Sequence, residues 1–113
     1  MEEVLSFITS LAGVKGCLVV GKDGLVIESR VWSGINDELI GAMIAGVFTN
    51  VENSMEELEG GELVELLIEG KGEKVFAFNL ETALLIVLLE KEVNLGLVKS
   101  SVEETIEKLK ALL

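Results

Sequence analysis

Residues 17–30 read CLVVGKDGLVIESR, two β-rich runs that flank Gly21-Lys22-Asp23-Gly24. A glycine-bracketed lysine after a strand can belong to a phosphate-binding loop, but that loop needs Gly-Lys-Ser/Thr leading directly into a helix. Here Asp23 follows the lysine, and a β run follows Gly24. Asp-Gly between two apolar runs is a strong hairpin signal. The stretch therefore predicts a β-hairpin and not a phosphate cradle.

Two helical patterns flank this hairpin. Residues 3–12 place apolar side chains, including Leu11 and Ala12, on one face before Gly13, a helix stop. A longer helix is predicted from Asn36 or Asp37, both good N-caps, to Leu58, before Gly60-Gly61. Its apolar positions recur at i, i+3 and i+4; they are Leu39, Ile40, Met43, Ile44, Val47, Phe48, Val51, Met55 and Leu58.

The second half of the chain predicts three strands and a helix. The strands lie at residues 62–69, 74–79 and 83–89, and the helix spans about 95–112. Val64, Leu66 and Ile68 are expected to point to one side of their strand, and the run at 83–89 is apolar on both faces, as in a central covered strand. Short turns between strands favour a largely antiparallel sheet.

The predicted fold class is α+β, in the order α-β-β-α-β-β-β-α, as one domain over residues 1–113. The five-stranded, mainly antiparallel sheet is expected to carry the long second helix on one face and the two terminal helices on the other.

Composition excludes several classes of function. The chain has 113 residues, with 20 acidic and 9 basic side chains, and a net charge of −11. Nucleic acid and anionic lipid are therefore unfavourable partners. The N-terminus lacks the basic and apolar regions of a secretory signal, and the apolar run at 83–89 is too short to cross a bilayer. We expect a cytoplasmic protein without membrane insertion.

The residue inventory is poor in catalytic groups. The chain has no His and a single Cys17, so it offers no Cys/His metal site and no histidine to activate the thiol. Acidic residues at helical spacing, such as Glu52, Glu56 and Glu59, are typical of a solvated face. We expect no catalytic, metal or cofactor site, and no enzyme activity of its own.

Two stretches indicate an interface. The long helix carries Gly41, Ala42, Ala45 and Gly46 among its apolar residues, although glycine within a helix costs about 1 kcal/mol. A second chain passing close by would explain them, and so would tight packing on the protein's own sheet. VELLIE at 64–69 has Leu67 on its otherwise acidic side, which suits an edge strand that pairs across a subunit boundary.

Over essentially its whole length the sequence resembles the roadblock/dynein light-chain family, in its bacterial and archaeal roadblock-domain form. The resemblance is carried by GVKGCLVVGKDGLVIES (13–29), Asp37-Glu38-Leu39 followed by AMIAGVF, GELVELLIEG (61–70) and NLGLVK (94–99). It implies a roadblock/profilin-like fold, which agrees with the order predicted from the residues.

The resemblance also implies a homodimer in which strand 62–69 pairs with its symmetry mate and helices 37–58 pack antiparallel. The interface residues it implies are Gly41, Ile44, Ala45, Phe48, Glu52, Val64, Glu65, Leu66, Leu67 and Ile68.

Family members serve as platforms for small Ras-like GTPases, and some bacterial members activate them. Because Arg30 ends a hairpin strand and is no evident arginine finger, activation would reposition the GTPase's own residues. The alternatives are a structural dimerisation or scaffold subunit, and a small-molecule sensor with a cavity lined by Leu84–Leu88.

Overall fold

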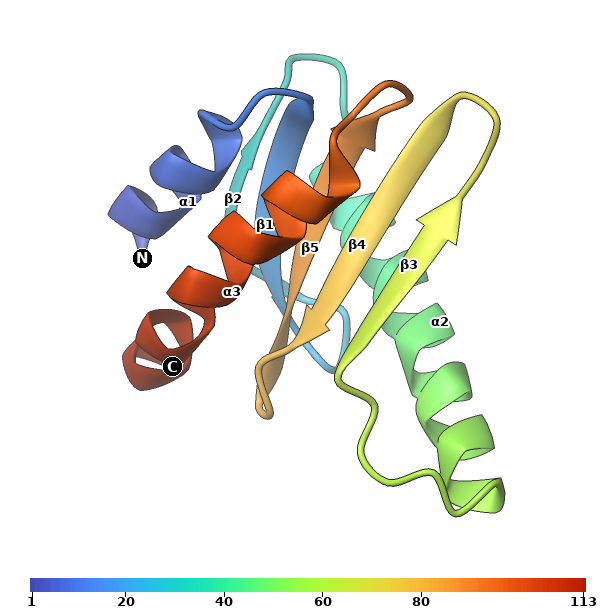
Figure 1. Cartoon of the computed structure of the whole chain (residues 1–113). Helices are drawn as coiled ribbons and strands as arrows, with labels where there is room; N and C mark the ends of the chain where they lie inside the picture. The colour runs from blue at the N-terminus through green and yellow to red at the C-terminus, as the bar shows by residue number, and fades with distance from the viewer.

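The predicted hairpin is present in the computed structural model, which describes residues 1–113 (Figure 1). Strands β1 (Val14–Gly21) and β2 (Val26–Val31) pair antiparallel. Gly24 has a φ of +89°, a conformation that favours glycine, and its N–H donates to the Gly21 carbonyl over 2.9 Å. The Asp23 carboxylate accepts from Leu25 N at 3.0 Å, which completes the turn.

The predicted order of elements is confirmed. Helix α1 is Glu2–Thr9, α2 is Asp37–Glu57 and α3 is Leu95–Leu112, while strands β3, β4 and β5 are Glu65–Glu69, Glu73–Asn79 and Ala83–Glu90. The side chain of Asn36 accepts from Leu39 N at 3.1 Å, so the predicted N-cap of α2 is confirmed. Asn94 caps α3 in the same way, through Leu97 N at 3.0 Å.

The sheet has the strand order β2-β1-β5-β4-β3, and every neighbouring pair is antiparallel. β5 is central, and its residues Ala83–Leu89 are all buried. This confirms the prediction from its two apolar faces. The order leaves β2 and β3 as the two edges, on opposite sides of the sheet (Figure 1).

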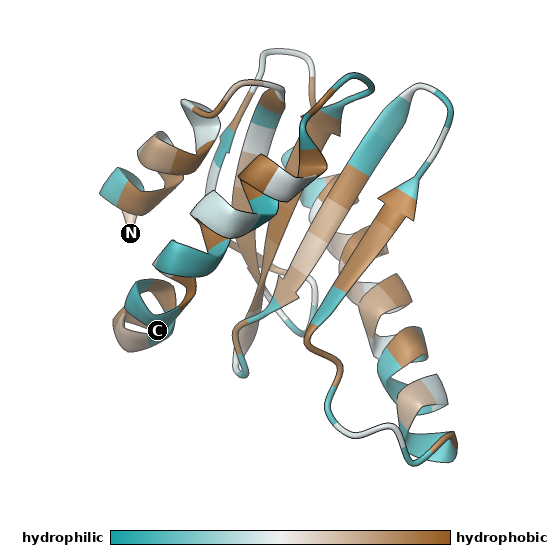
Figure 2. Cartoon of the chain, viewed as in Figure 1, coloured by the Kyte–Doolittle hydropathy of each residue, from teal (hydrophilic) through white to brown (hydrophobic).

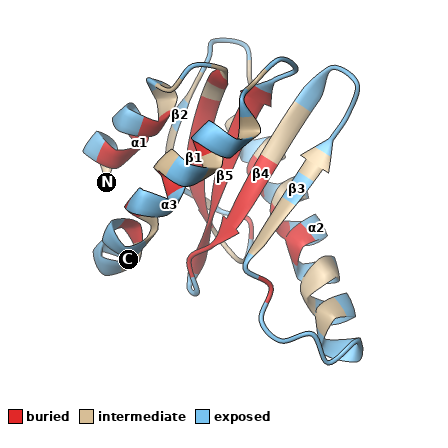
Figure 3. Cartoon of the chain, in the orientation of Figure 1, coloured by how far each residue is buried: buried red, intermediate tan, exposed pale blue.

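Two apolar layers hold the helices against the sheet, as predicted. Helices α1 and α3 cover one face, where Leu5 and Val102 pack with inward residues of β1, β4 and β5. Helix α2 covers the other face, where Phe48 packs against Leu18 and Ile86. Figure 3 shows the buried residues concentrated along β1, β5 and β4, between these layers.

Two predicted boundaries were wrong. Helix α1 ends at Thr9 and not at 12, and Ala12 is exposed. The hydroxyls of Thr9 and Ser10 donate to the carbonyls of Leu5 and Phe7, a local bond that competes with continued helix.

Strand β3 begins at Glu65, so Val64 lies outside it and is exposed, unlike the half-buried Leu66 and Ile68. The side-chain amide of Asn79 donates to the Leu63 carbonyl at 2.8 Å, so a side chain and not the β4 backbone binds the residue before Val64.

Candidate functional site

The chemically reactive residues are few and internally satisfied. Cys17 is fully buried, its Sγ donates to the Leu5 carbonyl at 3.6 Å, and burial raises the pKa of its thiol to about 12. No group of three or more His, Cys, Asp or Glu side chains is arranged to hold a metal ion. The exposed surface therefore carries the features that can be assigned a role.

The lysine of the hairpin turn has a structural partner. Lys22 Nζ lies 3.1 Å from Glu52 Oε2 and 5.7 Å from the centroid of the Phe48 ring, and both charged side chains are partly buried. Lys22 thereby ties the β1–β2 turn to helix α2. Glu52, predicted at a dimer interface, is engaged within its own chain.

One side of α2 packs closely on the hairpin. A Cβ added to Gly41 would lie 2.9 Å from Val20 Cγ1, and a Cβ added to Gly24 would lie 3.0 Å from Ala42 Cα. Ala45 and Phe48 on the same side are buried. Packing on the chain's own sheet thus accounts for Gly41 and Ala45, whereas Ala42, which is exposed, meets the hairpin turn through its backbone.

Beside this packed side, an apolar flank runs along α2. Ile40, Ile44 and Val51 are half-buried, and next to them Met43 is 59% exposed and Val47 40% exposed. These five residues follow helical spacing, so they form one continuous stripe. A Cβ added to Gly46 would meet nothing within 4 Å, so this small residue faces open space.

Strand β3 presents unpaired backbone groups on its outer side. Asn79 N donates to Val64 O at 3.0 Å and Gly70 N donates to Glu73 O at 2.8 Å. With the register of the pair, these two hydrogen bonds establish which residues of β3 bond to β4 and which do not. In an antiparallel pair the intervening residues direct their N–H and C=O groups away from the partner strand. The outward groups therefore belong to Glu65, Leu67 and Glu69.

The charges along β3 are acidic but partly neutralised. Lys99 Nζ of α3 lies 3.0 Å from Glu65 Oε1, and this hydrogen bond is the main reason that the pKa of Lys99 is raised. Glu69 at the other end of the strand has no ion pair within the chain.

The α2 flank and β3 belong to one surface. Leu66 and Val75 are half-buried and pack on the same apolar cluster as Ile40 and Ile44, and the half-buried Ile68 lies opposite Val75 in the β3–β4 ladder. A hollow of about 340 Å³, lined in part by Ile35, Ile40, Val75 and Leu88, opens between the start of α2 and the sheet. We name this the α2–β3 surface: Ile40, Met43, Ile44, Val47, Val51, Leu66, Ile68 and Val75, with the open β3 edge. Figure 2 shows hydrophobic colour along β3 and β4 and on turns of α2.

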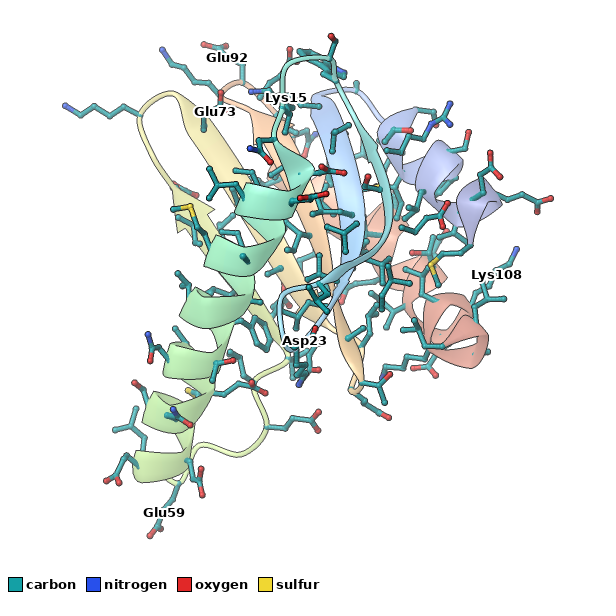
Figure 4. All side chains as sticks on the ribbon, turned by 180° about the vertical axis from the view of Figure 1, so that it is seen from behind. Lys15, Asp23, Glu59, Glu73, Glu92 and Lys108 are labelled. Carbon is teal, nitrogen blue, oxygen red and sulfur yellow. The ribbon has the colours of Figure 1, made fainter.

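The C-terminal end of α2 extends beyond the sheet. Glu59, labelled in Figure 4, marks this end, and Leu58 beside it is 75% exposed. The end of the helix therefore presents an exposed apolar side chain.

The predicted interface residues lie at different places in the chain, and their role in a dimer stays a prediction. Gly41, Ala45 and Phe48 are covered by the chain's own sheet, because the small residues allow α2 to approach the hairpin. Ile44, Leu66 and Ile68 lie on the α2–β3 surface, Glu65 and Leu67 direct backbone groups outward, and Val64 stands exposed before the strand.

Met43 and Val47 were not among the predicted interface residues. The signal available in the sequence was that the helix is apolar over more of its circumference than one sheet can cover.

The cavity expected of a small-molecule sensor is not formed by the predicted residues. Leu84, Leu85, Ile86 and Val87 are almost wholly buried in the packed layers, and Leu88 contributes to the hollow at the start of α2. The filled core opposes that interpretation.

Comparison with known proteins assigns the family. A family model described as the Roadblock/LC7 domain matches residues 1–90. The chain belongs to the Roadblock/LC7 family. This confirms the resemblance inferred from the hairpin and the segments around it.

Relatives of this Roadblock/LC7 chain include an uncharacterized protein of the archaeon Methanocaldococcus jannaschii, MJ1340. It is 37% identical over 112 residues, which cover 99% of this chain and 98% of the relative. Among solved structures, a Roadblock/LC7 domain from Streptomyces avermitilis has a TM-score of 0.91 at 13% identity, covering 99% of this chain and 96% of that one.

Two further structures share the fold. MglB of Myxococcus xanthus has a TM-score of 0.90 at 20% identity and covers 97% of this chain and 91% of that one. Profilin IB of Acanthamoeba castellanii has a TM-score of 0.63 at 17% identity, with 92% and 93% covered. The predicted roadblock/profilin-like fold is confirmed. None of the helices is both long and apolar enough to span a membrane.

Proposed function

We propose that this Roadblock/LC7 chain is a cytoplasmic homodimer that binds and regulates a small Ras-like GTPase. The observation that carries the proposal is the α2–β3 surface, where Met43 and Val47 stand exposed beside an unpaired strand edge. An apolar flank next to open backbone groups is costly in water and is covered by a second copy in a symmetric dimer.

In the proposed dimer, β3 pairs antiparallel with β3 of the second copy and the two α2 helices lie antiparallel. Glu65, Leu67 and Glu69 supply the strand hydrogen bonds, while Met43, Val47 and the half-buried Ile44 supply apolar contact. We propose that residues 1–113 act as a single roadblock-type domain in this assembly. One solved structure of MglB, a protein that shares the fold, has a tetrameric arrangement. This supports self-association as a property of similar chains.

The GTPase partner is proposed from membership of the Roadblock/LC7 family, because the resemblance found in the sequence implies a platform for small Ras-like GTPases. We propose no active site in this chain: Cys17 is buried, and Arg30 lies on β2, at the edge opposite the α2–β3 surface. The nucleotide would be held by the partner, and this chain would reposition the partner's own catalytic residues.

The proposal is tested with purified Ras-like GTPases from the same genome, each loaded with GDP or a GTP analogue. We expect at least one to bind in one nucleotide state, measured by calorimetry or size-exclusion chromatography. If no GTPase binds in either nucleotide state while the chain is still dimeric, the result would favour the alternative of a structural dimerisation subunit.

The role of arginine is tested separately. If a GTPase is activated, Arg30→Ala should leave stimulated hydrolysis intact. Loss of stimulation, with binding retained, would contradict a mechanism without an arginine finger.

A further inference from the structure

The second edge of the sheet, β2, also presents unpaired backbone groups. Trp32 N donates to Lys15 O at 3.0 Å, and the register pairs Cys17 with Arg30 and Val19 with Glu28. By the alternation of antiparallel bonds, Ser29 and Val31 direct their N–H and C=O groups outward. This edge lies on the side of the sheet opposite β3 (Figure 1).

Apolar side chains accompany this edge. Ile27 is 49% exposed and Trp32 53% exposed. The register shift between Val19 and Val20 leaves Ile27 as a bulge, which interrupts the regular β1–β2 ladder between Val26 and Glu28. The regular stretch available to a partner strand is therefore short, from Glu28 to Val31.

The charges on this stretch are of both signs. Glu28 and Arg30 are opposite Val19 and Cys17, which both face the α1–α3 layer, so the two charged residues share that face. Neither forms an ion pair within the chain. Arg30 is the only arginine in the protein.

We propose that β2 is a second self-association surface, which pairs antiparallel with β2 of another copy about a two-fold axis at Ser29. This register places Ser29 opposite Ser29 and Glu28 opposite Arg30 of the second copy, the latter twice by symmetry. Moving the axis by one residue places Arg30 opposite Arg30 or Glu28 opposite Glu28, and like charges directly opposite are destabilising. The charge pattern thus selects both the occupant, a second copy of this chain, and the register.

This surface is independent of the α2–β3 surface. If both operate, dimers are joined edge to edge and the sheet continues through the assembly. The net charge of −11 per chain opposes association, and Asp37, which accepts from the Ser29 hydroxyl at 2.5 Å, adds negative charge near the axis. Association is therefore expected near physiological salt, where a Debye length of about 8 Å screens this repulsion.

The test uses charge variants of the full chain, with mass measured by sedimentation velocity over a wide concentration range. Arg30→Glu turns both attractive pairs into repulsive ones and should weaken assembly at this seam at least about tenfold. Glu28→Arg should do the same. An equimolar mixture of these two variants restores both opposite-charge pairs and should restore assembly.

Lys71→Glu is the matched control, because it makes the same charge change at an exposed turn residue outside β2. It should leave assembly unchanged. Because rescue occurs on mixing, a folding defect in either single variant cannot imitate the expected result.

The register of the proposed β2–β2 pairing is tested separately, by disulfide formation between the two copies. Ser29→Cys should form an intermolecular disulfide, because directly opposed residues of a hydrogen-bonded pair lie about 5.5 Å apart at Cα, within disulfide range. Ser33→Cys in the following loop should not. An Arg30→Glu variant that assembles like the original protein, or a mixture that fails to restore assembly, would overturn the proposal.

Discussion

The two edge strands of this sheet are both open in one chain, yet they differ in what surrounds them. β3 lies beside an exposed apolar flank of α2, and the outward positions at its two ends, Glu65 and Glu69, are acidic. β2 carries Glu28 and Arg30 on one face, and the exposed apolar side chains beside it, Ile27 and Trp32, belong to the strand and the residue after it and not to a helix flank. Pairing at β3 would bury apolar surface, whereas pairing at β2 would be directed by a charge pattern that specifies the register.

The difference indicates two kinds of contact. Apolar burial contributes most of the free energy of association, whereas complementary charges mainly determine partner and register. We therefore expect tight pairing at the α2–β3 surface and weaker, salt-dependent pairing at β2. The following predictions test this comparison in order of decreasing effect.

The largest effect is expected from proline in β3. Leu66→Pro removes an N–H that bonds to β4, and should destabilise the chain by about 1–3 kcal/mol for the unpaired carbonyl alone. Leu67→Pro removes an N–H that points outward, so the chain should stay folded while the dimer is lost. Circular dichroism and sedimentation distinguish the two results; a dimeric Leu67→Pro variant would contradict the proposed seam.

Charge on the α2 flank should have the next largest effect. Met43→Lys with Val47→Lys buries two unpaired ammonium groups in the proposed dimer, and we expect the dimer to weaken at least about 100-fold. Thr49→Lys, at an exposed position on the other flank of the same helix, is the control and should leave dimerisation unchanged. If the two variants weakened the dimer equally, the result would contradict a specific role of the apolar flank in dimerisation.

The glycines of α2 should respond in opposite directions. Gly41→Ala places a Cβ 2.9 Å from Val20 Cγ1, and should destabilise the fold by about 1–3 kcal/mol. Gly46→Ala enters open space and should raise the unfolding free energy by about 0.4–1 kcal/mol through helix propensity. Urea denaturation at one protein concentration measures both. A destabilising Gly46→Ala would instead show that a second helix packs closely there.

The smallest effect on assembly is expected from Cys17, whose buried and unreactive thiol makes cysteine trapping at the edges possible. Its thiol pKa is raised from 9.0 to about 12, so its contribution to stability is complete below pH 9 and is lost as the pH rises towards 12. At pH 10 the unfolded thiol is ionised and the folded one is not, a loss of about 1.4 kcal/mol relative to pH 8. Cys17→Ala should reduce this pH dependence in urea denaturation. The native thiol should also resist alkylation at pH 8, and rapid labelling would contradict its burial.

Much of the fold could be predicted because its signals are local. The Asp-Gly turn required a left-handed glycine at Gly24, and Asn36 carried the N-cap of α2. The run at 83–89, apolar on both faces, indicated the central strand. The end of α1 and the start of β3 were missed because the bonds of Thr9, Ser10 and Asn79 that define them depend on side-chain geometry.

The candidate surface was only partly predictable. Sequence periodicity identified α2 as apolar around much of its circumference, but it did not separate Gly41, Ala45 and Phe48, which face the sheet, from Met43 and Val47, which face outward. That distinction depends on where the hairpin meets the helix, and this contact joins residues about twenty positions apart.

The elements, their order, the acidic composition and the family could all be inferred from local sequence signals, since propensity, periodicity and turn chemistry act over a few neighbouring residues. Which strands are edges became known from the folded arrangement, because strand order depends on pairing between distant segments. The folded arrangement also showed that Lys22 binds Glu52 and holds the hairpin turn to α2. The two edges, and therefore the surfaces proposed for assembly, exist only once those distant segments have met.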